Sequence, residues 1–319
     1  MILITGCAGF IGFHLAYKLS KRRKVIGIDS LDKYYSVKLK KQRLNLLKKN
    51  KKFKFLKIDL NNFKKLKKEL KNQKIEYIVH LAAQPGVRIS TKNPHNTLIQ
   101  NLLAFSNIIE IARLKKIKKF VYASSSSIYG DTKTYPFVEN DYKNIPKSVY
   151  GATKLSNEII ANSYSRNFKI QAVGLRFFTV YGPYGRPDMA YYSFLNKLNM
   201  KKKIQVFNNG KMMRDFTYID DVINGIIKVI KTNFKNKHEI LNIGKGKPDD
   251  LMDLINNLEK YYNENFSIEY LNIIPKGDIQ KTFSDTKKAK KLIKLKPKVD
   301  LKEGVKKFVS WYKKNHKIK

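Results

Sequence analysis

Hydrophobic residues in the first part of the chain gather in short runs separated by longer amphipathic stretches. The runs lie at residues 1–5, 24–29, 53–59, 76–82, 119–124 and 170–178. Short apolar runs of this kind are typical of strands buried on both faces of a parallel sheet. Helical patterns lie between them, at 13–19, 62–70, 96–114 and after residue 150. This alternation predicts an α/β fold with a doubly wound parallel sheet.

The regular alternation loosens after about residue 180. Residues 181–190 are rich in Gly and Pro, helical patterns follow at 218–231, 249–262 and 305–314, and a short strand is expected at 240–246. No internal repeat or flexible linker separates the two parts. We therefore expect a sheet domain over residues 1–180 and a smaller C-terminal α/β lobe over 181–319, packed together, with some strands or helices returning to the first domain.

Composition places the chain among ordinary globular proteins. Of its 319 residues 42% are hydrophobic and 12% aromatic, which is enough for a sizeable core. No apolar run approaches the roughly 20 residues of a membrane-spanning helix, and the first residues do not resemble a signal peptide. The single cysteine, Cys7, excludes an internal disulfide and favours the cytoplasm.

The formal net charge of +41 has two interpretations. Such a charge can indicate a nucleic acid or an anionic membrane as partner. The lysines, however, are spread over almost every segment instead of forming one stripe, which favours solvated surface positions. We expect no specific nucleic acid partner and no membrane partner, and keep a polyanion-binding surface as the remote alternative.

A glycine-rich loop follows the first predicted strand and opens the first helix. Gly6, Gly9 and Gly12 have the spacing that lets a backbone turn tightly and approach a pyrophosphate at a helix N-terminus. Asp29 ends the second strand, where a carboxylate accepts both ribose hydroxyls of NAD and repels a 2′-phosphate. Together these features predict a Rossmann-type NAD site; the alternative is a purely structural glycine turn.

Further positions fit the same cofactor. Asp59 follows the third strand, where it could meet the adenine amine, and the small residues Ala82 and Ala83 end the fourth strand. Asn101 is either a cofactor contact or an amide that packs helices. The complete predicted cofactor site is Gly6, Gly9, Phe10, Ile11, Gly12, Asp29, Asp59, Leu60, Ala82, Ala83, Asn101, Tyr150 and Lys154.

The segment SVYGATKLSNE, residues 148–158, places Lys154 four residues after Tyr150. On a helix these side chains lie on one face. A phenol has a pKa near 10 and is a poor base at pH 7, but a nearby cation favours the phenolate. Such a base can take a proton from a sugar hydroxyl while a hydride leaves the same carbon. Ser124–Ser127, at a predicted strand end, can orient that hydroxyl.

These motifs resemble the extended short-chain dehydrogenase/reductase family of nucleotide-sugar enzymes. The resemblance rests on TGCAGFIG, on the serine cluster in VYASSSSIYG and on YGATK, and it covers essentially the whole chain. It implies that Ser125, Tyr150 and Lys154 are the catalytic residues. Family members usually dimerise through two long helices, here near 94–114 and 150–166, so the resemblance also implies a homodimer.

Within that family the chain looks like the UDP-glucuronate 4-epimerases. The stretches LAAQPGVRIS, RFFTVYGPYGRPDMA and RDFTYIDD carry this likeness, with Pro85 and Tyr184 departing from the family pattern. It implies NAD-dependent conversion of UDP-glucuronate to UDP-galacturonate, through a transient 4-keto sugar, for surface polysaccharide. Related dehydratases and decarboxylases carry an acid after the catalytic serine, whereas this chain has Ser126 and Ser127.

The resemblance also assigns the substrate contacts. Ser126, Ser127 and Thr179 would bind the carboxylate, although the extra serines could also belong to a tight strand end. Arg88, Arg186 and Arg214 are arginines in a lysine-rich chain, and a guanidinium binds phosphate and carboxylate in a bidentate manner; for Arg88 a surface role is the alternative. Asp278 matches the family's ribose-binding Asp. The histidines show no ligand spacing and predict no metal site; His80 is expected in the core. A UDP-glucose or UDP-N-acetylhexosamine 4-epimerase remains the closest alternative.

Overall fold

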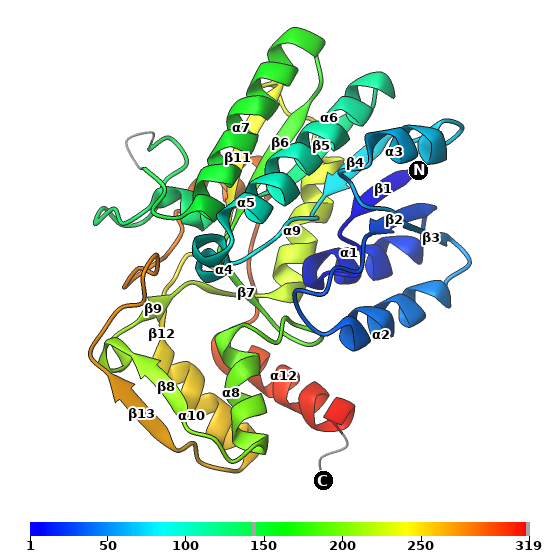
Figure 1. Ribbon diagram of the computed structural model, residues 1–319. Helices are drawn as coiled ribbons and strands as arrows, with labels where there is room; N and C mark the ends of the chain where they lie inside the picture. The colour runs from blue at the N-terminus through cyan, green and yellow to red at the C-terminus, as the bar shows by residue number, and fades with distance from the viewer. Residues whose placement is uncertain (142–144, 317–319) are drawn as a thin grey trace.

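One seven-stranded parallel sheet forms the centre of the computed structural model, which describes residues 1–141 and 145–316 (Figure 1). The strand order is β11-β6-β5-β4-β1-β2-β3. Its strands are β1 (Ile2–Thr5), β2 (Val25–Asp29), β3 (Phe53–Lys57), β4 (Tyr77–His80), β5 (Lys119–Ser125), β6 (Ala172–Phe177) and β11 (His238–Ile243). Each neighbouring pair is parallel. The predicted Rossmann-type fold is confirmed.

Helices cover both faces of this sheet. On one face α1 (Phe10–Ser20) packs against α2 (Val37–Lys48) and α9 (Ile219–Lys231). On the other face α6 (Ala104–Leu114) packs against α3 (Phe63–Leu70) and α7 (Val149–Phe168). Adjacent strand residues contribute to two different core clusters, because successive side chains of a strand point to opposite faces. The continuous apolar runs in the sequence follow from this two-sided burial.

A second group of elements forms the lobe in the lower part of Figure 1. Helix α10 (Leu251–Tyr262) packs against α8 (Ala190–Asn199) and α12 (Leu301–His316). Strand β8 (Ile204–Phe207) pairs in parallel with β13 (Ile268–Leu271). Aromatic side chains of α8 and α12 interlock: the rings of Tyr191 and Phe308 meet edge to face at 4.8 Å.

Shorter elements connect the sheet with this lobe. The two-stranded pairs are β7 (Thr179–Tyr181) with β10 (Phe216–Tyr218), and β9 (Met213–Arg214) with β12 (Asp249–Asp250). The short helices are α4 (Val87–Lys92), α5 (Pro94–Leu98) and α11 (Lys287–Ile293), and a π-helical turn, η1 (Ile99–Leu103), joins α5 to α6. Two 3-10 turns are η2 (Ser126–Tyr129) and η3 (Asn208–Gly210).

Two elements of the second half return to the first domain. Strand β11 pairs with β6 along its whole length, and α9 packs on α1. Residues 317–319 of the expected second lobe lie outside the described residues. The helix α2 and the short α4 and α8 were not predicted from the sequence. In α2 the reason is composition, since lysines occupy much of the segment and obscure its helical period.

The core also contains a buried histidine. His80 is buried in the core as expected, where its Nδ1 lies 2.8 Å from the hydroxyl of Thr5, and burial lowers its pKa to about 3. Among the described residues, none of the helices combines the length and apolar character needed to cross a membrane.

Candidate active site

A cavity of about 750 Å³ opens at the carboxyl ends of the central strands. The segments that follow β1, β2, β4, β5 and β6 all line it, and the second lobe closes its other side. This is where ligands bind in open α/β sheets. Every predicted site residue except Asn101 lines this cavity. Residues from distant parts of the chain therefore meet in one cavity.

The glycine loop forms a tight backbone cradle at one end of the cavity. Gly6 has φ +71°, and a Cβ there would lie 2.7 Å from the backbone nitrogen of Ala82. A Cβ on Gly12 would lie 2.1 Å from the carbonyl oxygen of Gly6. A side chain at Gly6 would push the loop away from the segment after β4, and one at Gly12 would push α1 away from the loop. The helix α1 begins directly after Gly9, so its free N–H groups face the place that a pyrophosphate would take.

Backbone groups of two loops hold the carboxylate of Asp29 in place. One carboxylate oxygen accepts a hydrogen bond from the backbone N–H of Ala8 at 3.0 Å, and the other from that of Leu31 at 2.8 Å. Each oxygen keeps a free lone pair. Burial raises the pKa of Asp29, and these hydrogen bonds together with Lys40 and Arg43 act in the opposite direction. The residues of this end of the cavity therefore fit NAD.

The other predicted cofactor residues lie along the same wall, with one exception. Phe10, Ile11, Asp59, Leu60, Ala82 and Ala83 line the cavity. Asn101 does not; it is 2% exposed in the π-helical turn η1. Its side chain bonds both backbone groups of Gln84 and the hydroxyl of Thr153. Of the two interpretations of Asn101, this geometry favours the packing amide, which links the end of β4 to the first turn of α7.

The tyrosine, lysine and serine meet at the carboxyl end of β5. Ser148 caps α7 by accepting the backbone N–H of Gly151 at 3.0 Å. Tyr150 and Lys154 follow on one face of that helix, with the ammonium 5.7 Å from the ring centre. The ammonium also donates to the carbonyl oxygen of Ala123 at 3.0 Å. Ser125 ends β5, and its hydroxyl donates to the hydroxyl of Ser127 at 3.1 Å.

The local environment sets the protonation of this group. Burial raises the pKa of Tyr150, while the charge of Arg186 and the hydrogen bond with Ser125 lower it. Burial lowers the pKa of Lys154 to about 8. The phenol therefore stays protonated until further positive charge lowers its pKa, which suits a general acid and base.

A buried ion pair stands behind the serine cluster. The guanidinium of Arg176 on β6 donates two hydrogen bonds to the carboxylate of Glu158, at 2.9 and 2.8 Å. Glu158 lies one turn beyond Lys154 on α7 and also accepts the hydroxyl of Ser124 at 2.5 Å. This contact fixes the end of β5 against the catalytic helix.

The predicted sugar contacts Ser126, Ser127, Thr179 and Arg186 also line the cavity. Arg186 donates two hydrogen bonds to Asp188, at 3.1 and 2.5 Å. The hydroxyl of Tyr34 donates to the same carboxylate at 3.0 Å. Asp188 therefore holds Arg186 to the loop after β2.

Two further arginines, Arg88 and Arg214, contact Asp278. Arg214 donates to one carboxylate oxygen at 3.1 Å and Arg88 to the other at 3.3 Å. Arg88 is also 5.1 Å from the ring centre of Phe207 and is exposed over 58% of its side chain, whereas Arg214 is exposed over 17%. Arg88 thus lies at the cavity mouth, and Arg214 lies deeper.

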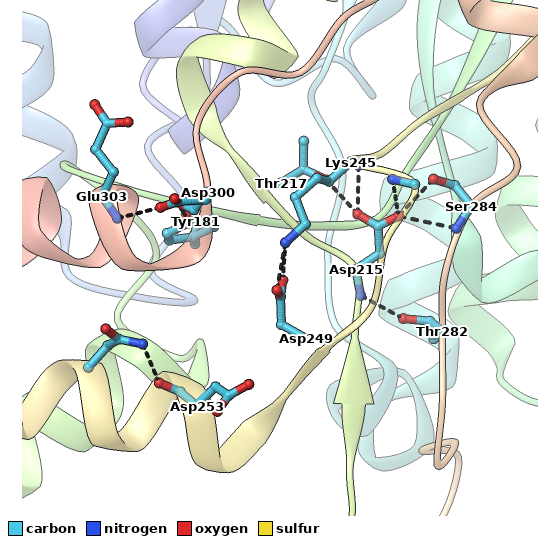
Figure 2. A network of polar contacts seen from close by, with 12 residues as sticks. Tyr181, Asp215, Thr217, Lys245, Asp249, Asp253, Thr282, Ser284, Asp300 and Glu303 are labelled. Carbon is cyan, nitrogen blue, oxygen red and sulfur yellow. Dashed lines mark hydrogen bonds and ion pairs between the residues drawn. The ribbon is translucent and has the colours of Figure 1, made fainter.

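Asp215, next to Arg214, is the hub of a buried polar network (Figure 2). Its carboxylate is fully buried and accepts hydrogen bonds from the Thr217 hydroxyl, the backbone N–H groups of Lys245 and Gly246, and both the N–H and the hydroxyl of Ser284. Lys245 itself pairs with Asp249. One carboxylate therefore joins the β9–β10 segment, the turn after β11 and the chain that follows Asp278.

Sequence reasoning missed several residues of this site. Tyr34 and Asp188 form the contact described above, and Arg43 reaches the same loops from α2. The sequence contained a signal for Asp188, which follows Arg186 by two residues, and for Arg43, which is an arginine in a lysine-rich helix. Within residues 1–141 and 145–316, no group of three acidic, His or Cys residues is placed to hold a metal ion.

Fold and cavity together define a dinucleotide-dependent enzyme of the Rossmann type, with a tyrosine–lysine pair in its cavity. Residues 2–244 match the model of the NAD dependent epimerase/dehydratase family. The chain belongs to this family, and the resemblance seen in its motifs is confirmed.

Individual relatives and solved structures show the same likeness over the full length. The chain is 40% identical over 315 residues to a UDP-glucuronate 4-epimerase from Thermodesulfobacterium geofontis, covering 98% of this chain and 96% of that protein. It is similar to the crystal structure of UDP-glucuronic acid 4-epimerase from Bacillus cereus in complex with UDP-glucuronic acid and NAD, with a TM-score of 0.90, 36% identity, and coverage of 98% and 99%. It is also similar to UDP-glucose 4-epimerase from Thermotoga maritima, with a TM-score of 0.87, 28% identity and 99% coverage of each chain.

Proposed function

We propose that this protein catalyses NAD-dependent C4 epimerisation of UDP-glucuronate to UDP-galacturonate. One observation carries the proposal: Tyr150, Lys154 and Ser125 face the same cavity as Ser126, Ser127 and Thr179. The first group suits removal of a hydroxyl proton, and the second offers hydroxyl donors to a carboxylate. Its relatives named UDP-glucuronate 4-epimerase support this choice.

The division of the cavity follows from its residues. The glycine loop and Asp29 would hold NAD at the first domain, and Arg214 and Asp278 would hold the UDP part at the second lobe. When bound, NAD accepts a hydride from C4 of the sugar and returns it. NAD is regenerated in each cycle, so the reaction has no net redox change.

The protein's own groups move the proton. Tyr150 takes the proton of the C4 hydroxyl while Ser125 orients that hydroxyl, and the nearby charges of Lys154 and Arg186 favour the phenolate. The 4-keto sugar then turns over about its pyrophosphate linkage. Tyr150 returns the proton to the C4 oxygen, and return of the hydride to the opposite face of the turned sugar would invert C4. The sequence offers no acid at positions 126 and 127 that could eliminate water.

The carboxylate must also be controlled, because a 4-keto uronate is a β-keto acid and loses CO₂ readily. Hydrogen bonds from Ser126, Ser127 and Thr179, with the charge of Arg186, would hold the carboxylate away from the geometry that favours this loss. A neutral UDP-sugar would leave these donors without a partner, at a cost in affinity.

Proton NMR of UDP-glucuronate with the purified protein, without added reductant, tests the proposal. With the wild type, we expect signals of UDP-galacturonate to grow until the ratio of UDP-galacturonate to UDP-glucuronate is constant. With Tyr150→Phe, we expect the spectrum of UDP-glucuronate to stay unchanged. Conversion of UDP-glucose to UDP-galactose alone would show a neutral-sugar epimerase on the same site. Salt-sensitive RNA binding without turnover of either sugar would instead support the polyanion alternative.

A homodimer and a cytoplasmic location belong to the same proposal. Leu98, Leu103 and Ile159, on α5, η1 and α7, are 41%, 47% and 64% exposed, which suits a helical interface. Sedimentation of the wild type and of Ile159→Lys tests it: we expect the variant alone to run as a monomer. The buried free thiol of Cys7 is compatible with a reducing cytoplasm, where the product would serve surface polysaccharide synthesis.

A further inference from the structure

Arg43 on α2 lies fully buried between two loops of the active site. One terminal nitrogen donates to the carbonyl oxygen of Ala8 at 2.8 Å and to the hydroxyl of Tyr35 at 2.7 Å. The other donates to the carbonyl oxygens of Tyr184 at 2.6 Å and Gly185 at 2.9 Å. A single guanidinium therefore spans the glycine loop and the loop that carries Arg186.

The two loops depend on this contact in different ways. Ala8 lies between Gly6 and Gly9, and its N–H is already held by Asp29, so Arg43 fixes the carbonyl side of the same residue. Tyr184 has φ +55°, a left-handed conformation that is unfavourable for a residue with a side chain. Arg43 holds its carbonyl oxygen while Phe13 and Trp311 pack against its ring, at 5.0 and 4.9 Å.

Burial of the Arg43 guanidinium is unfavourable for the stability of the fold. Among the ion pairs of the described residues, Arg43 has no carboxylate partner, in contrast to Arg176, which pairs with Glu158. Its Nε is buried and lacks a hydrogen-bond partner in the part of the chain that the structure describes. Asp29 is near enough for Arg43 to lower its pKa but forms no ion pair with it. A buried cation without a paired carboxylate lowers stability, which points to another purpose for its contacts.

We propose that Arg43 is a positioning residue that sets the distance between the NAD-binding loop and the sugar loop. Hydride transfer needs the reacting atoms about 3–3.5 Å apart, and a misplacement of about 1 Å can cost about 100-fold in rate. Arg43 fixes both loops through their backbones and does not line the cavity. The inference rests on the proposed function for its turnover measurement only.

Arg43→Lys is the central variant, because it keeps the positive charge but replaces the two donor nitrogens of the guanidinium with a single ammonium. A single ammonium cannot serve the carbonyl oxygens of Ala8, Tyr184 and Gly185 with the same geometry. We expect kcat to fall about 10- to 100-fold and NAD affinity, measured by calorimetry, to fall about tenfold. UDP affinity should stay within about twofold, because Arg214 and Asp278 lie in another part of the cavity.

Matched variants separate positioning from general damage. Tyr35→Phe removes one acceptor and leaves the loop carbonyls bonded, so its loss should be much smaller than that of Arg43→Lys. Arg113→Lys changes an arginine paired with Glu110 far from the cavity and should match the wild type. Adding millimolar guanidinium to Arg43→Ala should restore part of its kcat, while equal sodium chloride should not.

Two results would overturn the proposal. The first is an Arg43→Lys protein that unfolds more easily but has the kcat and NAD affinity of the wild type, which would make Arg43 purely structural. The second is an equal loss of UDP affinity, which would indicate general disruption. If the wild type converts no UDP-sugar, the proposed function fails, and the NAD and UDP affinities of these variants still decide the role of Arg43.

Discussion

Lys154 lies one helical turn beyond Tyr150, with its ammonium 5.7 Å from the centre of the phenol ring and bonded to the carbonyl oxygen of Ala123. The side chain of Lys154 thus connects α7, which carries it, to β5. Ser125 ends the same strand two residues later. The lysine therefore has a structural task, holding the base-bearing helix to the serine strand, as well as an electrostatic one.

Replacing Tyr150 with Phe removes only the hydroxyl that exchanges the proton. We expect the rate of epimerisation to fall about 10²- to 10⁴-fold, with UDP and NAD affinities unchanged. Tyr164→Phe, on the same helix but bonded to Glu110, is the control and should keep wild-type activity. Turnover by Tyr150→Phe close to the wild-type rate would assign the base elsewhere.

Arg214→Lys tests the nucleotide end of the cavity. The variant keeps a positive charge but loses the fork that contacts Asp278 and the carbonyl oxygen of Gln280. Since a hydrogen bond to a charged group contributes about 1.5–3 kcal/mol, UDP should bind about 10- to 100-fold more weakly in calorimetry. NAD affinity should not change; a parallel loss of NAD binding would contradict the division of the cavity.

Asp215→Asn should both destabilise the fold and weaken UDP binding. An amide nitrogen cannot accept hydrogen bonds, so it would face the backbone N–H groups that now bind Asp215. We expect the free energy of unfolding in urea to fall by about 2–4 kcal/mol, since each unsatisfied buried donor costs about 1–3 kcal/mol. The control is Asp253→Asn, on the exposed first turn of α10. It should change the free energy of unfolding by less than about 0.5 kcal/mol.

Lys119 predicts a specific dependence of stability on pH. The residue is 3% exposed, and its ammonium donates to the carbonyl oxygens of Val229, Ile230 and Thr232 at the end of α9. Burial lowers its pKa to about 8, below the value of about 10.4 in the unfolded chain. Between these values the unfolded chain binds more protons, so this group makes stability rise with pH.

Thermal unfolding of Lys119→Met beside the wild type measures that effect. At pH 7 the variant should be less stable by about 2 kcal/mol, because several helix-end carbonyls lose a charged donor. From pH 8 to 10 the wild type should gain stability relative to the variant. A constant difference over this range would show that Lys119 does not titrate there.

The sheet and the cofactor end of the site could be predicted from the sequence because they obey local rules. Apolar runs mark strands that are buried on both faces, and the order of Gly6, Gly9, Gly12 and Asp29 fixes a strand, a loop and a carboxylate at known separations. Tyr150 and Lys154 needed only the period of one helix. These features do not depend on how distant segments pack.

The remaining contacts depend on tertiary packing, which the sequence pattern does not record. Tyr34 meets Asp188 from 154 positions away along the chain. Asn101 looked equally suited to cofactor and helix packing until its bonds to Gln84 and Thr153 were seen. The helix that carries Arg43 was missed because its lysine-rich surface hides its apolar stripe.

Strand β11 has a consequence for how the protein is made. It closes the sheet beside β6, yet it is formed by residues 238–243, after most of the second lobe's strands have been synthesised. A nascent or truncated chain ending near residue 180 would leave β6 as an open edge, ready to pair with another chain. The sheet of the cofactor-binding half is therefore completed late: during synthesis its β6 edge has no partner strand until β11 emerges from the ribosome.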